Sequence, residues 1–458
     1  MKLENIKSVY FIGIGGIGMS AVARYFLSLG KMVGGYDRKE TELTRVLAAE
    51  GADIHYEDNP SLISSAFFDK ESSLIVYTPA IPADHSEMKT FVEHGQQLHK
   101  RAEVLGMITR SEKALCVAGT HGKTTTSAMA AHILHESHTG CDAFLGGITR
   151  NYNSNFLLSE KREFVVVEAD EFDRSFHHLS PYISVITSCD PDHLDIYGTA
   201  EAYYESFRHY TSLIQPGGAL IMHADVNLKP DLAEGVRSFT YGASEGDFRA
   251  ENVRIKDGEI DFDFVSPVEN IPGIRLGVPA LINIDNGVAA MAMAQAAGAT
   301  AIEIRSAMAS FKGIQRRFDF KLKSPHGAFL IDYAHHPEEL RKSILSMKAL
   351  YPGRRITGVF QPHLYTRTRD FYREFADSLS LLDEVVLTEI YPAREEPIAG
   401  VTSKLIFDNI RPGVAKRLCP ACSLSEYVDT HDFDVLMLLG AGDIADRAEE
   451  ITQILKKK

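Results

Sequence analysis

Residues 113–135 read KALCVAGTHGKTTTSAMAAHILH and give the clearest indication of how this chain folds. An apolar run (114–119) leads into a glycine-rich turn, GTHGKTTT, and then into a helical pattern. A strand, a glycine loop ending in Lys-Thr and a helix together form a phosphate-binding unit, in which backbone amides surround the phosphates and the lysine reaches the terminal oxygens. A full-length loop of this kind would have glycine at position 117, so Val117 marks a shortened variant.

We therefore predict that this loop binds ATP with Mg²⁺. The predicted ATP-binding residues are Gly119, Thr120, His121, Gly122, Lys123, Thr124 and Thr125. Acidic residues follow the later apolar runs. Glu168 ends FVVVE, and His193 lies between two aspartates in PDHLD. Coordination of metal or phosphate is one interpretation of these residues; a solvated loop at 168–171 and a structural histidine are the alternatives. The histidines at 132, 135 and 138 predict a polar helix surface.

On both sides of this stretch, short apolar runs alternate with helical segments along the whole chain. Most runs lead into Gly, Asp or His, which is typical of βαβ units around buried parallel sheets. The sequence thus predicts an α/β protein, with ligands beyond the carboxyl ends of the strands. The predicted strands cover residues 9–12, 74–77, 114–119, 164–169, 183–187, 327–332, 356–360, 384–389 and 434–440. Residues 240–275 alternate polar and apolar positions and predict an antiparallel excursion.

A second glycine motif lies near the start of the chain. Residues 13–18 read GIGGIG between the run VYFI and a helical pattern, and Asp37 ends the next predicted strand. Glycines allow close approach of a diphosphate, the helix N-terminus offers free N–H groups, and the acid can bind a ribose hydroxyl. The motif predicts a diphosphate site; a tight turn without a ligand is the alternative.

The last third of the chain carries candidate anion-binding residues. Arg316 and Arg317 lie at a predicted domain break, DYAHHP (332–337) follows one strand, and HLYTRTRD (363–370) follows another. Arginine binds carboxylate and phosphate with two parallel hydrogen bonds, so this pattern favours an anionic substrate. A surface salt-bridge pair is the alternative.

The bulk properties limit the partners. With 48 Lys+Arg against 62 Asp+Glu, the net charge of −14 argues against nucleic acid or an anionic membrane. The chain contains no run of 18 apolar residues, and its start does not resemble a signal peptide. Five scattered cysteines suit a reducing compartment, so we expect a cytoplasmic protein that acts on small molecules.

Taken together, the motifs resemble the Mur ligases, in order from Phe11 to Asp443. The motifs that carry the resemblance are IGIGGIGMS, GTHGKTTT, VVVEADEFDRSF, PDHLDIYG, QRRFDF, DYAHHPEE, HLYTRTRDF, PAREEPIAGVTS and LGAGDI. The resemblance implies ATP-dependent joining of an amine to a carboxylate in peptidoglycan precursor synthesis. It also implies a UDP-substrate-binding Rossmann-like domain (1–111), a central P-loop ATPase domain with a mainly parallel sheet (112–314) and a C-terminal Rossmann-like ligase domain (315–458).

The family's functional residues carry over to matching positions of this chain. The resemblance implies that Lys123, His193 and Arg317 are catalytic and that Thr124, Glu168 and His193 hold the metal. Further ATP contacts would come from Asn283, Asn286, Arg317 and Asp332. Substrate contacts would come from Gly15, Gly16, Ile17, Gly18, Asp37, His335 and Arg367.

Two positions of this chain depart from the family's pattern. This chain has Ile282 where the family usually has histidine before the first of those asparagines. Later-acting members carry a modified lysine shortly after the metal histidine, whereas this chain has Arg208 there and no lysine from His193 to Lys229. That difference favours the branch that joins L-alanine to UDP-N-acetylmuramate. The alternatives are a peptide-adding sister ligase, an NAD-dependent oxidoreductase and a non-catalytic nucleotide switch.

Overall fold

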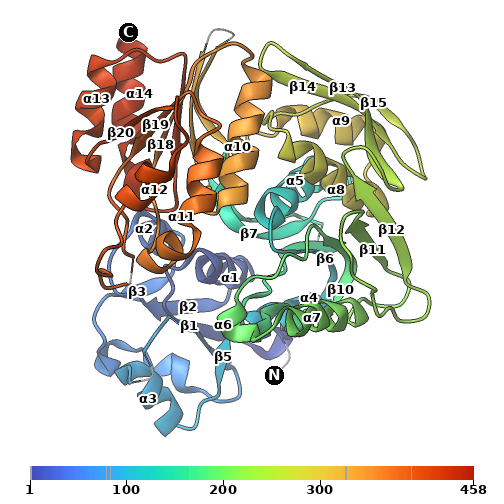
Figure 1. Cartoon of the computed structure of the whole chain (residues 1–458). Helices are drawn as coiled ribbons and strands as arrows, with labels where there is room; N and C mark the ends of the chain where they lie inside the picture. Colours follow the sequence, from blue (N-terminus) through green and yellow to red (C-terminus); the bar gives the residue numbers. More distant parts are fainter. Residues whose placement is uncertain (1–2, 79, 83, 162, 325–326, 394) are drawn as a thin grey trace. The chain divides into compact units, whose positions relative to one another are not determined.

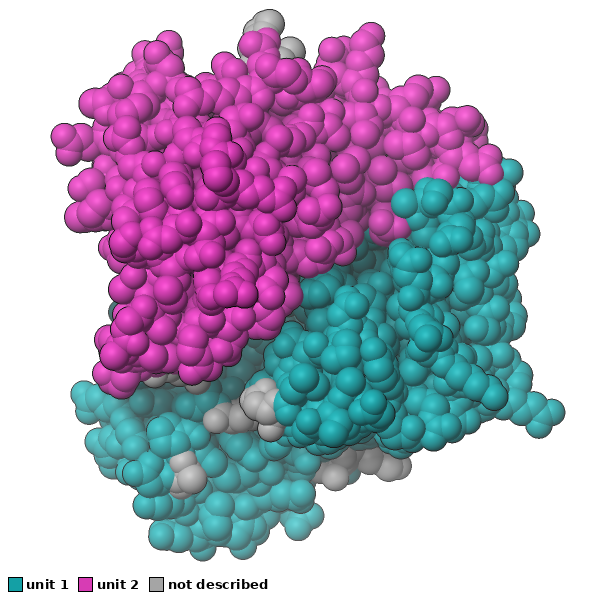
Figure 2. Space-filling view, in the orientation of Figure 1, with its two compact units in different colours: residues 1–249, 265–270, 286–307 teal, residues 250–264, 271–285, 308–458 magenta. Residues whose placement is uncertain are grey.

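The structure is a computed structural model that describes residues 3–78, 80–82, 84–161, 163–324, 327–393 and 395–458. It divides into two compact units, shown in different colours in Figure 2. Unit 1 comprises residues 1–249, 265–270 and 286–307. Unit 2 comprises residues 250–264, 271–285 and 308–458. Each unit therefore draws on several segments of the chain.

The first sheet of unit 1 is parallel and is built around β1 (Ser8–Ile12). Its order among the described strands is β3 (Asp53–His55), β2 (Met32–Tyr36), β1, β4 (Ser73–Tyr77) and β5 (Leu98–Lys100). All five residues of β1 are buried because helices cover both faces of the sheet. These helices are α1 (Ile17–Ser28), α2 (Glu42–Ala49), α3 (Ser86–Glu93) and α4 (Arg101–Ser111) (Figure 1).

The second sheet of unit 1 is centred on β6 (Lys113–Ala118), which pairs in parallel with two neighbours. Its strands in unit 1 follow the order β12 (Arg237–Gly242), β11 (Ala219–His223), β10 (Pro181–Ile186), β6, β9 (Phe164–Glu168), β7 (Asp142–Thr149) and β8 (Ser154–Leu157). Only the β7–β8 pairing is antiparallel among these described strands. The accompanying helices are α5 (Lys123–His135), α6 (Leu194–Tyr197), α7 (Ala200–Ser212) and α9 (Ala301–Ser310).

Four described elements continue from one unit into the other along the chain, namely β13 (Phe248–Lys256), the strand at residues 259–265, α8 (Ile282–Ala296) and α9. In unit 2, β14 (Glu259–Val265) and β15 (Ile271–Arg275) pair in the antiparallel manner that the alternation of residues 240–275 predicts. The prediction is wrong at the start of this segment, because Tyr241 and Gly242 of β12 pair in parallel with the first residues of β13.

The sheet of unit 2 has the order β16 (Asp319–Ser324), β17 (Gly327–Asp332), β21 (Val435–Leu439), β18 (Ile356–Phe360), β19 (Glu384–Leu387) and β20 (Ala415–Leu418). Its pairings are parallel except for β16 with β17. The helices of this part are α10 (Pro337–Leu350), α11 (Tyr365–Leu379), α12 (Lys404–Asn409), α13 (Leu424–Thr430) and α14 (Ala448–Lys457) (Figure 1).

The structure confirms the α/β class and all nine strands predicted from apolar runs. Each glycine-rich or charged motif lies directly after a parallel strand: 13–18 after β1, 119–125 after β6, 332–337 after β17 and 363–370 after β18. The parallel topology thus places the candidate residues at the carboxyl edges of the sheets. No helix in the described ranges is long and apolar enough to cross a membrane.

Candidate functional site

The lysine-bearing loop connects β6 to α5, whose N-cap is Gly122. Gly122 has φ +82°, a left-handed conformation that suits glycine, and an added Cβ would lie 2.7 Å from Oδ1 of Asn286. That same oxygen accepts a hydrogen bond from the Thr126 hydroxyl at 3.2 Å. Because Gly122 makes no side-chain cap, the first N–H groups of α5 face the loop and are suited to bind an anion.

The Lys123 ammonium lies inside this loop. Its Nζ donates to the carbonyl of Gly119 at 2.6 Å and to both carboxylate oxygens of Glu171 at 2.9 and 2.7 Å. Burial lowers the pKa of Lys123, but the carboxylates of Glu171 and Glu168 outweigh that effect and leave the pKa raised. The lysine is therefore a fixed positive charge at the start of α5.

A hydroxyl and a carboxylate lie together beside this lysine. Thr124, in the first turn of α5, donates to Oε1 of Glu168 at 3.0 Å, and the Gly146 N–H donates to Oε2 at 3.1 Å. An added Cβ on Gly146 would lie 2.2 Å from that oxygen, so a larger residue there would displace the Glu168 carboxylate. Hard oxygen donors of this kind are what Mg²⁺ prefers, and the pair therefore fits the predicted metal ion.

The rest of the loop is anchored to the segment that follows β10 and to α7. The His121 N–H donates to the Ser188 hydroxyl at 2.9 Å, and the Thr120 hydroxyl lies 2.8 Å from the Tyr203 hydroxyl. Thr125 lies in the first turn of α5. These contacts hold the loop backbone in place without using the N–H groups that open α5.

His193 lies further along that segment, just before α6. It has φ +53°, its ring packs edge-on against Phe172 at 5.1 Å, and its Nε2 lies 3.8 Å from a carboxylate oxygen of Asp192. The described residues contain no group of three or more His, Cys, Asp or Glu side chains that could hold a metal ion. The role of His193 in a metal site with Thr124 and Glu168 stays a prediction.

The first glycine loop surrounds the start of α1. Asp37 follows β2 and accepts a hydrogen bond from the Gly15 N–H at 2.7 Å. Gly16 is the N-cap of α1, and Ile17, the first residue of the helix, is 38% exposed. An added Cβ on Gly18 would lie 2.6 Å from the Arg101 guanidinium, so glycine lets this cation approach the loop.

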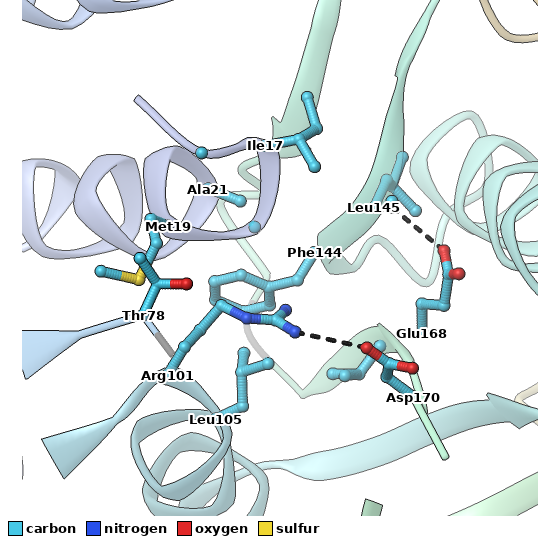
Figure 3. Close-up of a pocket in the computed structure, with 14 residues that line it drawn as sticks. Ile17, Met19, Ala21, Thr78, Arg101, Leu105, Phe144, Leu145, Glu168 and Asp170 are labelled. Carbon is cyan, nitrogen blue, oxygen red and sulfur yellow. Dashed lines mark hydrogen bonds and ion pairs between the residues drawn. The ribbon is translucent and has the colours of Figure 1, made fainter. Parts of the chain in front are cut away.

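A pocket of about 350 Å³ opens beside this loop (Figure 3). In Figure 3 the Arg101 guanidinium extends from α4 toward Asp170, and the closest distance between their charged atoms is 3.7 Å. The lining residues are Gly16, Ile17, Gly18, Met19, Ala21, Thr78, Arg101, Leu105, Phe144, Leu145, Gly146, Val167, Glu168 and Asp170. The first glycine loop and the carboxylate that contacts Thr124 thus line one pocket within unit 1.

In unit 2, the predicted Arg317 and Asp332 lie near each other at the end of β17. Asp332 accepts from the Phe318 N–H at 3.3 Å, and the Arg317 guanidinium lies 5.6 Å from the ring centre of Tyr333. Burial raises the pKa of Asp332 to about 6, although Arg317 opposes this shift. Asn283, in the first turn of α8, donates to the carbonyl of Val278 at 3.0 Å.

His335 and Arg367 belong to a second cluster in unit 2. The His335 ring lies 6.2 Å from the ring of His363 and 3.5 Å from a carboxylate oxygen of Glu339. Burial lowers the pKa of His335, with Glu339 opposing and Arg367 adding to the shift. Burial, His335 and Arg367 lower the pKa of His363 to about 4. Both imidazoles are therefore neutral near pH 7.

Sequence reasoning missed several partners. A solvated loop at residues 168–171 was one alternative, and it is wrong for Glu171, which is buried against Lys123. Arg101 and Gly146 have no motif of their own. The prediction of a polar helix surface is also wrong for His132, which is 2% exposed and lies 2.7 Å from the Tyr152 hydroxyl. Only the position of Glu171, three residues after the strand-end acid Glu168, could have indicated its role.

Three family models match the chain in succession. Residues 8–113 match the model described as Mur ligase family, catalytic domain, and residues 117–294 match the Mur ligase middle domain. Residues 316–450 match the model described as Mur ligase, glutamate ligase domain. The matched ranges cover the first glycine loop, the lysine-bearing loop and the unit 2 cluster respectively.

Curated proteins and solved structures of this family are similar along the whole chain. The UDP-N-acetylmuramate–L-alanine ligase of Phocaeicola vulgatus is 63% identical over 458 residues, which is 100% of each chain. The ligase of the same name from Porphyromonas gingivalis is 53% identical over 98% of this chain and 99% of its own. The crystal structure of UDP-N-acetylmuramate-alanine ligase from Thermotoga maritima aligns with a TM-score of 0.79 and 27% identity over 98% of both chains. On these similarities, the chain belongs to the Mur ligase family.

Proposed function

We propose that the protein joins L-alanine to the lactyl carboxylate of UDP-N-acetylmuramate with the hydrolysis of ATP, in peptidoglycan precursor synthesis. The arrangement that carries this proposal is the Lys123–Thr124–Glu168 group beside the first glycine loop. The full-length identity of 63% to a ligase of that name supports the choice of substrates.

The chemistry follows from the poor reactivity of a carboxylate. The lactyl carboxylate attacks the γ-phosphorus of ATP, ADP leaves, and an acyl phosphate forms. The amine of alanine then attacks the acyl carbon, and phosphate leaves from the tetrahedral intermediate. Both steps develop negative charge on oxygen, which fixed cations and aligned N–H groups stabilise.

We assign the phosphate contacts to the lysine-bearing loop. The N–H groups at the start of α5 and the ammonium of Lys123 would bind the β- and γ-phosphate oxygens. Asn286, whose side chain contacts the helix that carries this lysine, would border the nucleotide together with Asn283. Arg317 would bind phosphate oxygen and Asp332 the ATP ribose, as the family motifs imply.

Thr124, Glu168 and His193 would hold Mg²⁺. The hydroxyl–carboxylate contact of 3.0 Å between Thr124 and Glu168 supports the first two of these ligands. When bound, the ion neutralises charge on the phosphate oxygens. Glu168 also lines the pocket of the first glycine loop, so this carboxylate would lie near the end of the substrate that reacts.

We assign substrate contacts to two groups of residues. Gly15, Gly16, Ile17, Gly18 and Asp37 would bind the UDP end of the sugar nucleotide. His335 and Arg367 would bind the lactyl carboxylate or the incoming alanine. Because the lowered pKa of His335 keeps its imidazole neutral at pH 7, it can accept the proton that the alanine ammonium must lose.

We also propose that residues 1–111, 112–314 and 315–458 act as the UDP-substrate, ATPase and ligase domains. The ranges of the three family models support these boundaries. The five free cysteines support a cytoplasmic location, where ATP is also available.

Phosphate release tests the proposal, with ATP and Mg²⁺ present and UDP-N-acetylmuramate or L-alanine omitted in turn. Release should require both substrates, and mass spectrometry should detect the alanyl product. Lys123→Ala should lower kcat by about a hundredfold or more because a cation at the transferred phosphate is lost. Turnover with a tripeptide in place of alanine would instead indicate the peptide-adding sister ligase. Turnover unaffected by Lys123→Ala would refute the assigned site.

A further inference from the structure

The Lys123 ammonium already has an anionic partner within the protein. Glu171 contacts its Nζ with both carboxylate oxygens, at 2.9 and 2.7 Å. The lysine side chain is 14% exposed and the glutamate side chain 2% exposed. Any phosphate that binds this lysine must therefore compete with a buried carboxylate. The Glu171 carboxylate opposes phosphate binding in two ways, because it attracts the lysine and repels the phosphate.

The backbone around Glu171 is held in an unusual conformation. Asp173 and Arg174 are consecutive residues with φ +52° and +54°, which non-glycine residues seldom adopt. The carbonyl of Glu171 accepts hydrogen bonds from the Tyr197 hydroxyl and, at 3.0 Å, from the Arg174 N–H. Strained segments of this kind occur where the surroundings fix one arrangement and a ligand can favour another.

The same segment is tied to the start of α4, which borders the first glycine loop. Lys100 donates to Asp173 at 2.6 Å, and Arg101 lies 3.7 Å from Asp170. Figure 3 shows the guanidinium of Arg101 and the carboxylate of Asp170 facing each other in the pocket. An anionic ligand in this pocket would compete with Asp170 for Arg101.

We propose that Glu171 is a positioning residue that restrains Lys123 until nucleotide binds, and that residues 170–174 link its release to an anionic ligand at Arg101. This inference rests on the proposed function, in which the ligand at Arg101 is the sugar nucleotide and the competing phosphate belongs to ATP. Glu171 then weakens ATP binding to the free protein. The sugar nucleotide relieves this restraint, so the protein binds ATP productively only when the acceptor is present.

Calorimetric titration with Mg²⁺ and a non-hydrolysable ATP analogue tests this role, with and without UDP-N-acetylmuramate. Wild type should bind the analogue about tenfold more tightly when the sugar nucleotide is present. Glu171→Gln should bind it tightly in both conditions, because the competing charge is gone. Asp170→Asn, which breaks only the link to Arg101, should reduce the effect of the sugar nucleotide. In turnover, Glu171→Gln should lower both the KM for ATP and kcat, whereas a general loss of structure would raise KM.

The matched control is Glu163→Gln, which removes the carboxylate from an exposed lysine–glutamate pair of the same length, 2.8 Å to Lys113. It should bind the analogue as wild type does. If Glu171→Gln fails to fold, Glu171→Asp decides, since its shorter carboxylate should hold Lys123 less firmly and tighten analogue binding. If the folded Glu171 variant binds the analogue as wild type does, or more weakly, the inference about Glu171 is overturned and the proposed function still stands. Failure of wild type to bind the analogue at all would also overturn the proposed function.

Discussion

The carboxyl of Glu87 is buried against the first sheet, where its Oε2 accepts from the Tyr10 hydroxyl at 2.8 Å and its Oε1 lies 3.3 Å from Nε2 of His55. Burial raises the pKa of Glu87 to about 7; the Tyr10 hydrogen bond opposes this shift, and Asp58 adds to it. Between the ordinary value of 4.5 and pH 7, the folded protein therefore binds more protons than the unfolded chain. The free energy of unfolding should fall as the pH rises through this window.

Glu87→Gln should remove this pH dependence, because the amide stays neutral and can still accept from Tyr10. The unfolding free energy of the variant minus that of wild type should therefore rise by roughly 2 kcal/mol from pH 5 to pH 8. Urea denaturation at the two pH values measures the difference. Glu93→Gln, at the exposed end of the same helix α3, is the control. A variant whose difference from wild type does not change with pH would contradict this account.

At the scale of an element, α11 begins with an unusual cap. Its N-cap Leu364 has φ +71° and makes no side-chain cap hydrogen bond. Instead Glu395 accepts from the N–H of Thr366 at 3.0 Å and from its hydroxyl. Because Arg367 is the next residue, the carboxylate that caps this helix also sets the position of a proposed substrate-binding arginine.

Glu395→Ala should therefore affect both stability and function. Loss of a helix cap costs about 1 kcal/mol, and fraying of the first turn should lower kcat/KM for L-alanine. We expect a decrease of about tenfold, comparable to the loss of one good polar contact. Thermal unfolding and initial rates measure the two effects. Glu396→Ala changes the adjacent exposed residue and should leave both near wild type, and equal behaviour of the two variants would argue against the cap.

At the scale of the whole molecule, the chain enters and leaves each unit more than once. The six-stranded sheet β16–β21 lies entirely within residues 315–458, as does its core cluster, which includes Phe329, Val359 and Leu438. Unit 1, by contrast, includes residues 286–307, which are distant in sequence from its first 249 residues. Within unit 1, the Asn286 side chain contacts Thr126.

We therefore expect a fragment of residues 315–458 to fold by itself. It should unfold cooperatively in urea, at lower stability than in the full chain, because it loses contacts such as Leu281 N–H to the Ser346 hydroxyl at 2.9 Å. A fragment of residues 1–249 lacks part of unit 1 and should unfold with a broader transition. Circular dichroism during denaturation measures both. A gradual transition for residues 315–458 would show that its sheet needs the remaining segments of unit 2.

The class of fold, the nine predicted strands and both glycine loops could be predicted from the amino-acid sequence alone. Buried parallel strands require continuous apolar runs, and a phosphate-binding turn requires glycines at local spacing, so both features are encoded in neighbouring residues. Which side chains meet could be seen only in the folded protein. Glu171 pairs with Lys123 across 48 residues, and Glu395 caps Thr366 across 29. Such partners depend on which strand ends lie side by side, and strand order is set by packing of the whole sheet rather than by local pattern.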